Sequence, residues 1–277
     1  MIINYDKVIN TIVAWIKEYI SNTTIKSLVI NTSECTIESL LTVLLCKKTG
    51  IKTIMIGIDN LFPEERFQQN FATEHSVEWI CDPEKYIYDD VRMSFHIDPY
   101  FIWNKKSYTA LKNSVHFSLV NYYCTYNNGV IVGSDNKNKM GLIRNYNKFG
   151  IDIAPLADLY KSECNELFFY LSKKSTDFEK NGLNVLVNGL SHSEIEWADR
   201  EEIRTQIAFG PALIGATIPV GIVTSELDPS KHIAWMGYSG RQREVVAQMH
   251  QLEKASRHKY NPNLPICELR SKLDLVR

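Results

Sequence analysis

The stretch Gly129–Lys161, GVIVGSDNKNKMGLIRNYNKFGIDIAPLADLYK, decides the fold. Its apolar run Val130–Val132 predicts a short buried strand, followed by a polar Gly-Ser-Asp-Asn turn. A helix is predicted to start at Ala157-Asp158, with Lys161 one turn in. Open α/β sheets bind ligands at the carboxyl ends of their strands, and a carboxylate, a carboxamide and a lysine there suit a nucleotide phosphate and its metal ion. An ordinary solvated loop explains the same pattern equally well.

The rest of the chain alternates helical and strand patterns. Apolar runs predict strands at residues 27–30, 53–58 and 77–80, and helices at residues 5–20, 40–45, 59–71, 108–126 and 163–171. The alternation predicts the α/β class with a doubly wound parallel sheet, organised as one domain over residues 1–277. Residues 82–107 show no clear period and are expected to be irregular. In helix 108–126 the apolar stripe Leu111, Val115, Leu119 and Tyr122 predicts a face directed to the core or to a dimer partner.

Composition and charge exclude several classes of protein. The 277 residues are 44% hydrophobic and 23% charged, which is ordinary for a globular chain. A net charge of −1 gives no indication of a nucleic-acid or membrane-surface partner. No apolar run approaches the roughly 18–20 residues of a membrane span, and a cytoplasmic location is expected. The six cysteines include no C-x-x-C pair, which argues against a zinc site and a dense disulfide framework.

Three separated pieces of the sequence resemble the ammonia-dependent NAD synthetases. They are Gly133–Lys137, Lys148–Gly150 and Pro155–Lys161, against roughly GTDNKSE, TKYG and PxxDLYK in that family. The resemblance implies an adenine nucleotide alpha hydrolase-like fold over essentially the whole chain, and a homodimer. It also implies a ligase that adenylates a carboxylate with ATP before ammonia attacks, and therefore a small-molecule nucleotide or carboxylate substrate with ATP and Mg²⁺ as cofactors.

The resemblance also implies roles for individual residues that match the family's motifs. The residues implied to be catalytic are Asp135, Lys161, His258 and Lys259. Those implied to bind the nucleotide are Asn136 and Lys148, together with four residues of the first strand-to-helix loop, which are Ser33, Thr36, Glu38 and Ser39.

That first loop departs from the family's Ser-Gly-Gly-x-Asp-Ser phosphate loop. Aligned on its last two residues, Glu38 replaces the aspartate and is expected to bind the metal ion, while Ser39 is kept. Cys35 and Thr36 stand where the glycines let backbone N–H groups approach phosphate, and Glu34 adds a negative charge that repels it. A purely structural turn is the competing interpretation.

Other family features are replaced. Lys139 stands where the family has a metal-binding glutamate, and the arginine pair of the preceding helix is lost, with Ala110, Asn113, Ser114, His116 and Phe117 at the matching spacing. Residues 237–243 suit an anion at a helix start, or a solvated helix entry. Three functions therefore stay open. They are a ligase with a changed substrate, an inactive nucleotide-binding or scaffold homologue, and an enzyme of changed chemistry.

Overall fold

The computed structural model describes residues 4–21, 23–33, 35–58, 63–82, 89–91, 93–94, 105–137, 150–172, 197, 240–242, 244–245 and 264–269. The chain separates into two compact units. The sheet unit comprises Ile12–Ser134 and Tyr146–Pro155, and the second unit comprises Met1–Thr11, Asp135–Asn145 and Leu156–Arg277. The single domain over residues 1–277 stays a prediction.

The sheet has four parallel strands in the order β3-β2-β1-β4, which confirms the predicted α/β class. The strands are β1 (Ser27–Asn31), β2 (Lys52–Ile58), β3 (Glu78–Asp82) and β4 (Gly129–Ile131). Each begins and ends within one or two residues of its predicted position, because parallel strands covered on both faces are continuous apolar runs. Val132, just past β4, forms an isolated parallel bridge with Ile153.

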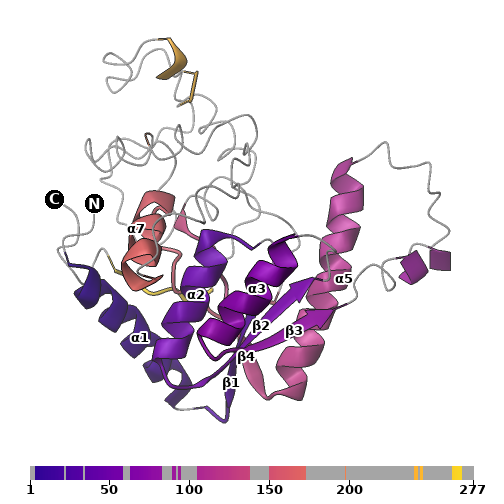
Figure 1. Ribbon diagram of the computed structural model, residues 1–277, viewed down its shortest axis with the longest axis horizontal. Helices are drawn as coiled ribbons and strands as arrows, with labels where there is room; N and C mark the ends of the chain where they lie inside the picture. Colours follow the sequence, from indigo (N-terminus) through magenta and orange to yellow (C-terminus); the bar gives the residue numbers. More distant parts are fainter. Residues whose placement is uncertain are drawn as a thin grey trace. The chain divides into compact units, whose positions relative to one another are not determined.

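Helices cover both faces of this sheet (Figure 1). α2 (Ile37–Lys48) connects β1 to β2, and α3 (Pro63–Glu74) connects β2 to β3. The chain then returns past both strands through α5 (Lys105–Tyr126) to β4, on the other side of β1. Because crossovers are right-handed, connections that run in opposite directions along the sheet lie on opposite faces. β2 and β3 lie on one side of β1 and β4 lies on the other, so the strand order reverses between β1 and β4. Ligands of such sheets bind at the carboxyl ends of the strands beside this point.

The core under α5 confirms part of the predicted stripe of that helix, since Val115 is buried. Val120 and Cys124 pack with Val29 and Ile131 of the sheet, whereas Tyr122 is 61% exposed. Phe117 and Tyr123 are partly buried and pack against the same cluster, and Tyr122 lies on the exposed side of the helix. Residues 82–107 were expected to be irregular, but α5 already begins at Lys105.

A predicted helix start in the second unit is wrong. Pro155–Asp158 form turns, and α7 (Lys161–Ser172) begins only at Lys161. The backbone N–H of Tyr160 donates to Glu163 Oε2 at 2.9 Å. This hydrogen bond caps the start of α7, since Tyr160 immediately precedes the helix and Glu163 is its third residue. The remaining helix, α1 (Tyr5–Ser21), matches the predicted 5–20. Among the described residues, no helix combines the length and apolarity needed to cross a bilayer.

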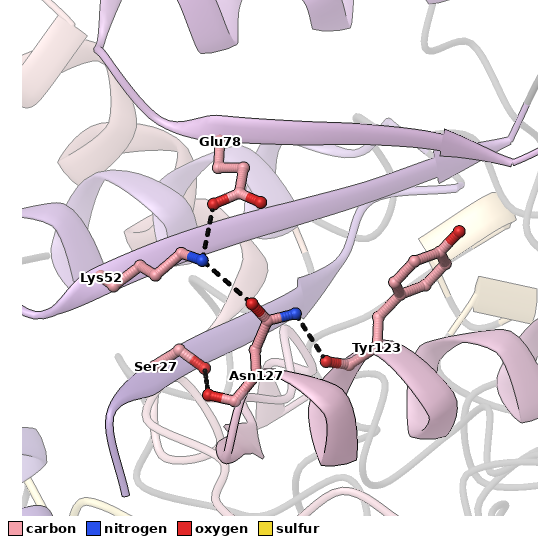
Figure 2. Close-up of polar contacts among 5 residues, drawn as sticks. All are labelled: Ser27, Lys52, Glu78, Tyr123 and Asn127. Carbon is pink, nitrogen blue, oxygen red and sulfur yellow. Dashed lines mark hydrogen bonds and ion pairs between the residues drawn. The ribbon is translucent and has the colours of Figure 1, made fainter.

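Polar contacts close the amino-terminal edge of the sheet (Figure 2). Lys52 Nζ lies 2.8 Å from Glu78 Oε2 on β3 and donates to Asn127 Oδ1 at 2.9 Å. Asn127 Nδ2 donates to the carbonyl of Tyr123, and Ser27 Oγ donates to the carbonyl of Asn127. The ion pair is half-exposed and contributes less than about 1 kcal/mol. The contacts fix the end of α5 against the strands, opposite the edge where ligands bind.

Candidate functional site

The chain turns sharply as it leaves β1. Asn31 Oδ1 accepts a hydrogen bond from the Ser33 N–H at 2.9 Å, and the Cys35 N–H donates to the Thr32 carbonyl at 2.8 Å. The Thr32 hydroxyl is buried and lies 3.1 Å from Gln68 Oε1 on α3. The turn is therefore tied to its own residues and to the neighbouring helix. It lies at the carboxyl edge, beside the point where the strand order reverses.

Cys35 adopts a backbone conformation that favours glycine. Its φ angle is 45°, in the left-handed region, where a side chain costs about 1 kcal/mol. The resembled family has a glycine at this position. The backbone shape that glycine permits is thus kept here with a cysteine in its place.

Thr36, at the second glycine position, has no such requirement. It is the N-cap of α2 with extended backbone angles, φ −84° and ψ 158°. Its Oγ1 accepts from the Ser39 N–H at 3.2 Å, and Ser39 Oγ donates to the Thr36 carbonyl at 2.8 Å. The sequence interpretation treated both replacements as obstacles, whereas the threonine stabilises the start of the helix.

Glu38 lies in the first turn of α2 and is 2% exposed. The positive end of the helix dipole favours a carboxylate there. No cluster of three or more His, Cys, Asp or Glu side chains occurs within the described part of the chain. A single buried carboxylate fits Mg²⁺, since this ion is commonly bound by one or two carboxylates together with substrate phosphates.

A second group of candidate residues lies in the second unit. Asp135 and Asn136 are 3% and 0% exposed. The following residue, Lys137, donates its backbone N–H to the Leu159 carbonyl at 2.7 Å and its Nζ to Tyr160 Oη at 3.0 Å. These contacts tie the GSDNK segment to the segment that precedes α7, so two pieces of the resemblance lie together.

The segment before α7 is held by a contact from the far end of the chain. Asp158 Oδ2 accepts from the backbone N–H of Leu269 at 2.8 Å, and both residues are buried. Lys161, implied to be catalytic, is the first residue of α7 and is half-buried.

The structure groups the predicted site residues into two sets. Ser33, Thr36, Glu38 and Ser39 share the turn after β1 and the first turn of α2. The second unit contains Asp135, Asn136 and Lys161. Three further predictions, Lys148, His258 and Lys259, lie outside the described residues.

The structure also gives the contacts of two residues outside these sets. Arg241, in the proposed anion-binding run, is exposed and lies 2.9 Å from Glu244, which favours a solvated helix entry. His116, noted in the sequence only as a replacement in the family's arginine run, is 3% exposed and contacts Asn31. A polar residue on the sheet-facing side of α5 is the sequence feature from which a role for His116 could have been predicted.

Replacing Cys35 tests the left-handed turn. At most positions glycine is less stable than alanine, but at positive φ the order reverses. We expect Cys35→Gly to unfold with a free energy about 1 kcal/mol higher than that of Cys35→Ala in urea. The control pair, Ser118→Gly and Ser118→Ala on the exposed side of α5, should show the ordinary order, with glycine about 1 kcal/mol lower. If the alanine variant is the more stable one at both sites, the left-handed conformation of Cys35 would be contradicted.

The comparison with protein families decides the relationship. The model of the NAD synthase family matches residues 8–191, more than half of the chain. The chain belongs to the NAD synthase family. A curated relative from Staphylothermus marinus, an NH(3)-dependent NAD(+) synthetase, is 27% identical over 177 residues. That match covers 61% of this chain and 63% of the relative, so it spans less than two thirds of the relative's length.

Solved structures of NAD synthase relatives show the same fold. An NH3-dependent NAD synthetase from Campylobacter jejuni, in complex with the nitrate ion, superposes with a TM-score of 0.61 at 17% identity, over 95% of this chain and 99% of that chain. An NMN synthetase from Francisella tularensis gives 0.64 at 16% identity, over 94% of this chain and 99% of that chain. The NAD synthase-like fold expected from the sequence is confirmed.

Proposed function

We propose that this NAD synthase family member is an ATP-dependent amide-forming ligase whose carboxylate substrate is not deamido-NAD. The observation that carries the proposal is the turn at Cys35. A strained left-handed residue persists where surrounding contacts hold it, and such residues concentrate at ligand-binding sites. Here it precedes the amino terminus of α2, where helix dipole and backbone N–H groups suit a polyphosphate.

Each group of residues has a role in the proposed reaction. Glu38 would hold Mg²⁺, and this ion, when bound, would neutralise part of the charge of the ATP phosphates. The Thr36 cap fixes the direction of the helix terminus that faces the phosphates. Asp135 and Lys161 keep the catalytic roles, and Asn136 the nucleotide-binding role, that the resemblance implies. Lys148, His258 and Lys259 keep the roles that the resemblance implies.

The changed substrate follows from the lost arginine pair. Two fixed cations of the family's helix would bind phosphate or carboxylate groups bidentately. In α5 the corresponding positions carry Ser114, which is exposed, and His116, which is buried and contacts Asn31. Neither supplies a fixed cation, so a dinucleotide with several anionic groups is poorly matched.

A second candidate is an inactive nucleotide-binding or scaffold homologue. One observation favours it. The N–H groups of Ser33 and Cys35 already donate to Asn31 Oδ1 and to the Thr32 carbonyl. Backbone donors used in this way do not bind phosphate, so the loop offers a nucleotide fewer contacts than a glycine-rich loop.

Pyrophosphate exchange separates the two functions. A ligase that adenylates a carboxylate transfers labelled pyrophosphate into ATP when its carboxylate is present. We expect exchange with at least one member of a panel of nucleotide and small carboxylates, and MgATP binding by calorimetry. MgATP binding without exchange on any panel member would favour the inactive homologue. If the protein binds no MgATP, both nucleotide-dependent functions would be contradicted. A scaffold function that needs no nucleotide would then be the remaining candidate.

The exposed aromatic side of α5 suits a homodimer. Tyr122 and Tyr126 are 61% and 77% exposed, and their rings stack with centroids 6.2 Å apart. Aromatic residues are enriched at interface cores. The neighbouring Tyr123 instead packs against the sheet core. We expect light scattering at micromolar concentration to give twice the 31.9 kDa chain mass.

Substitution of the two tyrosines tests this dimer. Tyr122→Ser with Tyr126→Ser is expected to weaken dimerisation at least about tenfold, since buried aromatic anchors dominate interface energies. Tyr170→Ser on α7 is the control, because Tyr170 is also exposed but its hydroxyl donates to Asp6 of its own chain. A monomeric wild type, or equal effects of both changes, would contradict an interface on α5.

A further inference from the structure

We infer that His116 is a positioning residue for the nucleotide loop, and that it acts through Asn31; this inference rests on the proposed function. Asn31 is the last residue of β1. Its Oδ1 contacts His116 Nε2 at 2.9 Å and the Ser33 N–H at 2.9 Å. One carboxamide oxygen thus joins a residue of α5 to the first turn of the loop that ends at the Thr36 cap.

The geometry fixes the direction of each hydrogen bond. The Ser33 backbone N–H can only donate, so the atom of Asn31 that it meets is the carbonyl oxygen. An oxygen with no hydrogen cannot donate to His116. Nε2 of His116 must therefore carry a hydrogen and donate it. Both lone pairs of Asn31 Oδ1 are then in use, and the side chain has a single orientation.

α5 holds the imidazole in place. His116 is 3% exposed, next to Val115, which is also buried, and the helix packs on β1 and β4. A buried hydrogen bond between elements of the same compact unit restricts Asn31 more than a surface contact would. Because Asn31 in turn holds the Ser33 amide, the position of α5 sets the path by which the chain leaves β1. The left-handed turn at Cys35 and the start of α2 lie on that path.

The proposal assigns a role to His116, which stands at one of the two arginine positions of the family pattern. Where the resembled helix has a cation for the ligand itself, this chain has an imidazole that contacts the loop. His116 would therefore not contact the ligand directly. It would instead support, through Asn31, the backbone that faces the phosphates. Loss of the imidazole should loosen the loop and weaken MgATP binding, without removing any group that touches the nucleotide.

The wild-type protein alone supplies the first test. Nitrogen-15 NMR of the imidazole is expected to show His116 Nε2 carrying a hydrogen in the nucleotide-free protein. Hydrogen exchange should show a protected Ser33 amide. Nε2 without a hydrogen would overturn the inference, because Asn31 Oδ1 would then have no donor from α5.

Variants supply the second test. His116→Leu removes the donor, whereas His116→Gln keeps an N–H group at similar reach. We expect His116→Leu to speed exchange of the Ser33 amide and to weaken MgATP binding, each roughly threefold to tenfold, as expected for one hydrogen bond. His116→Gln should restore both to within about twofold of wild type. Val120→Ala, on the same buried side of α5, is the control for general loss of packing and should leave the Ser33 amide protected relative to the strands.

The outcomes separate this inference from the proposed function. If His116→Leu leaves both Ser33 exchange and MgATP affinity unchanged, or if Val120→Ala has the same effects, the inference is wrong and the ligase proposal is unaffected. If the wild type binds no MgATP, the proposed function fails, and the role of His116 as a support of the nucleotide loop fails with it. Asn31→Leu combined with His116→Leu should bind no more weakly than Asn31→Leu alone; additive losses would also overturn it.

Discussion

Supplied with deamido-NAD, ATP, Mg²⁺ and ammonia, the purified protein is expected to form NAD at least about 1000-fold more slowly than the ~10 s⁻¹ common among enzymes. The physical reason is the loss of charge on α5. Ser114 and His116 stand at the family's two arginine positions; the serine is uncharged and exposed, and the histidine contacts Asn31. A positioned arginine stabilises a phosphate or carboxylate by two charge-assisted hydrogen bonds, and its loss commonly costs several kcal/mol.

The assay follows NAD by a coupled dehydrogenase reaction, with a conventional ammonia-dependent NAD synthetase as the positive control. Turnover within about tenfold of ~10 s⁻¹ would show that the arginine pair is dispensable here. In that case the deamido-NAD substrate, rather than a changed carboxylate, would be the correct interpretation. A negative result with intact MgATP binding would support the changed substrate.

The sheet could be predicted from the sequence because its physics is local. Leu28–Ile30 and Thr53–Ile58 are apolar runs, and strands buried on both faces have that signature in any context. The parallel direction of the strands could also be predicted, since strands that alternate with helices are joined by crossover connections. Their order in the sheet was not predicted. The predicted helix at 40–45 was too short because the real ends of α2, at Ile37 and Lys48, include polar residues that break the apolar pattern.

Errors arose where distant contacts outweigh local preference. The segment before α7 looks helical by its proline and acidic residues, yet Asp158 accepts a hydrogen bond from Leu269, 111 residues away. No local pattern encodes that partner. The apolar stripe on α5 was only partly confirmed, with Val115 buried and Tyr122 exposed, for a related reason. Two stripes at helical spacing coexist, and only packing on β1 and β4 selects the one containing Val120.

The candidate site was predictable in composition but not in conformation. The alignment identified Cys35 and Thr36 as departures from glycine, and it could not distinguish them. The structure does, because Cys35 has positive φ while Thr36 is an extended N-cap. The link between His116 and Asn31 was equally invisible, since it joins residues 85 positions apart. Residue roles carried over from the resemblance stay predictions.

Substitution of Glu38 is expected to have the largest effect on ATP-dependent activity. Glu38→Gln keeps the size of the buried side chain and removes the charge that would hold Mg²⁺. We expect pyrophosphate exchange to fall at least about 100-fold, in the range seen when one electrostatic contact is lost from an active site. Glu38→Asp, which introduces the family's residue, should keep exchange within about tenfold. Urea unfolding should show that Glu38→Gln remains folded, since its helix start is still capped by Thr36.

The loop itself gives the complementary test. The structure indicates that Thr36 should be left in place, because it caps α2. By sequence, Glu34 and Cys35 are the remaining departures that disfavour phosphate. Glu34→Ser with Cys35→Gly removes a negative charge and relieves the left-handed strain. We expect calorimetry to show MgATP binding about tenfold tighter than in wild type. Adding Thr36→Gly should then lower stability by a few tenths of a kcal/mol without a further gain in affinity. Tight MgATP binding by the wild type, unimproved by either change, would mean that Cys35 and Glu34 belong to a working loop, and it would contradict a degenerate nucleotide pocket. Full pyrophosphate exchange by Glu38→Gln would instead show that Glu38 does not hold Mg²⁺. The proposed ligase would then lack the carboxylate assigned to the metal ion.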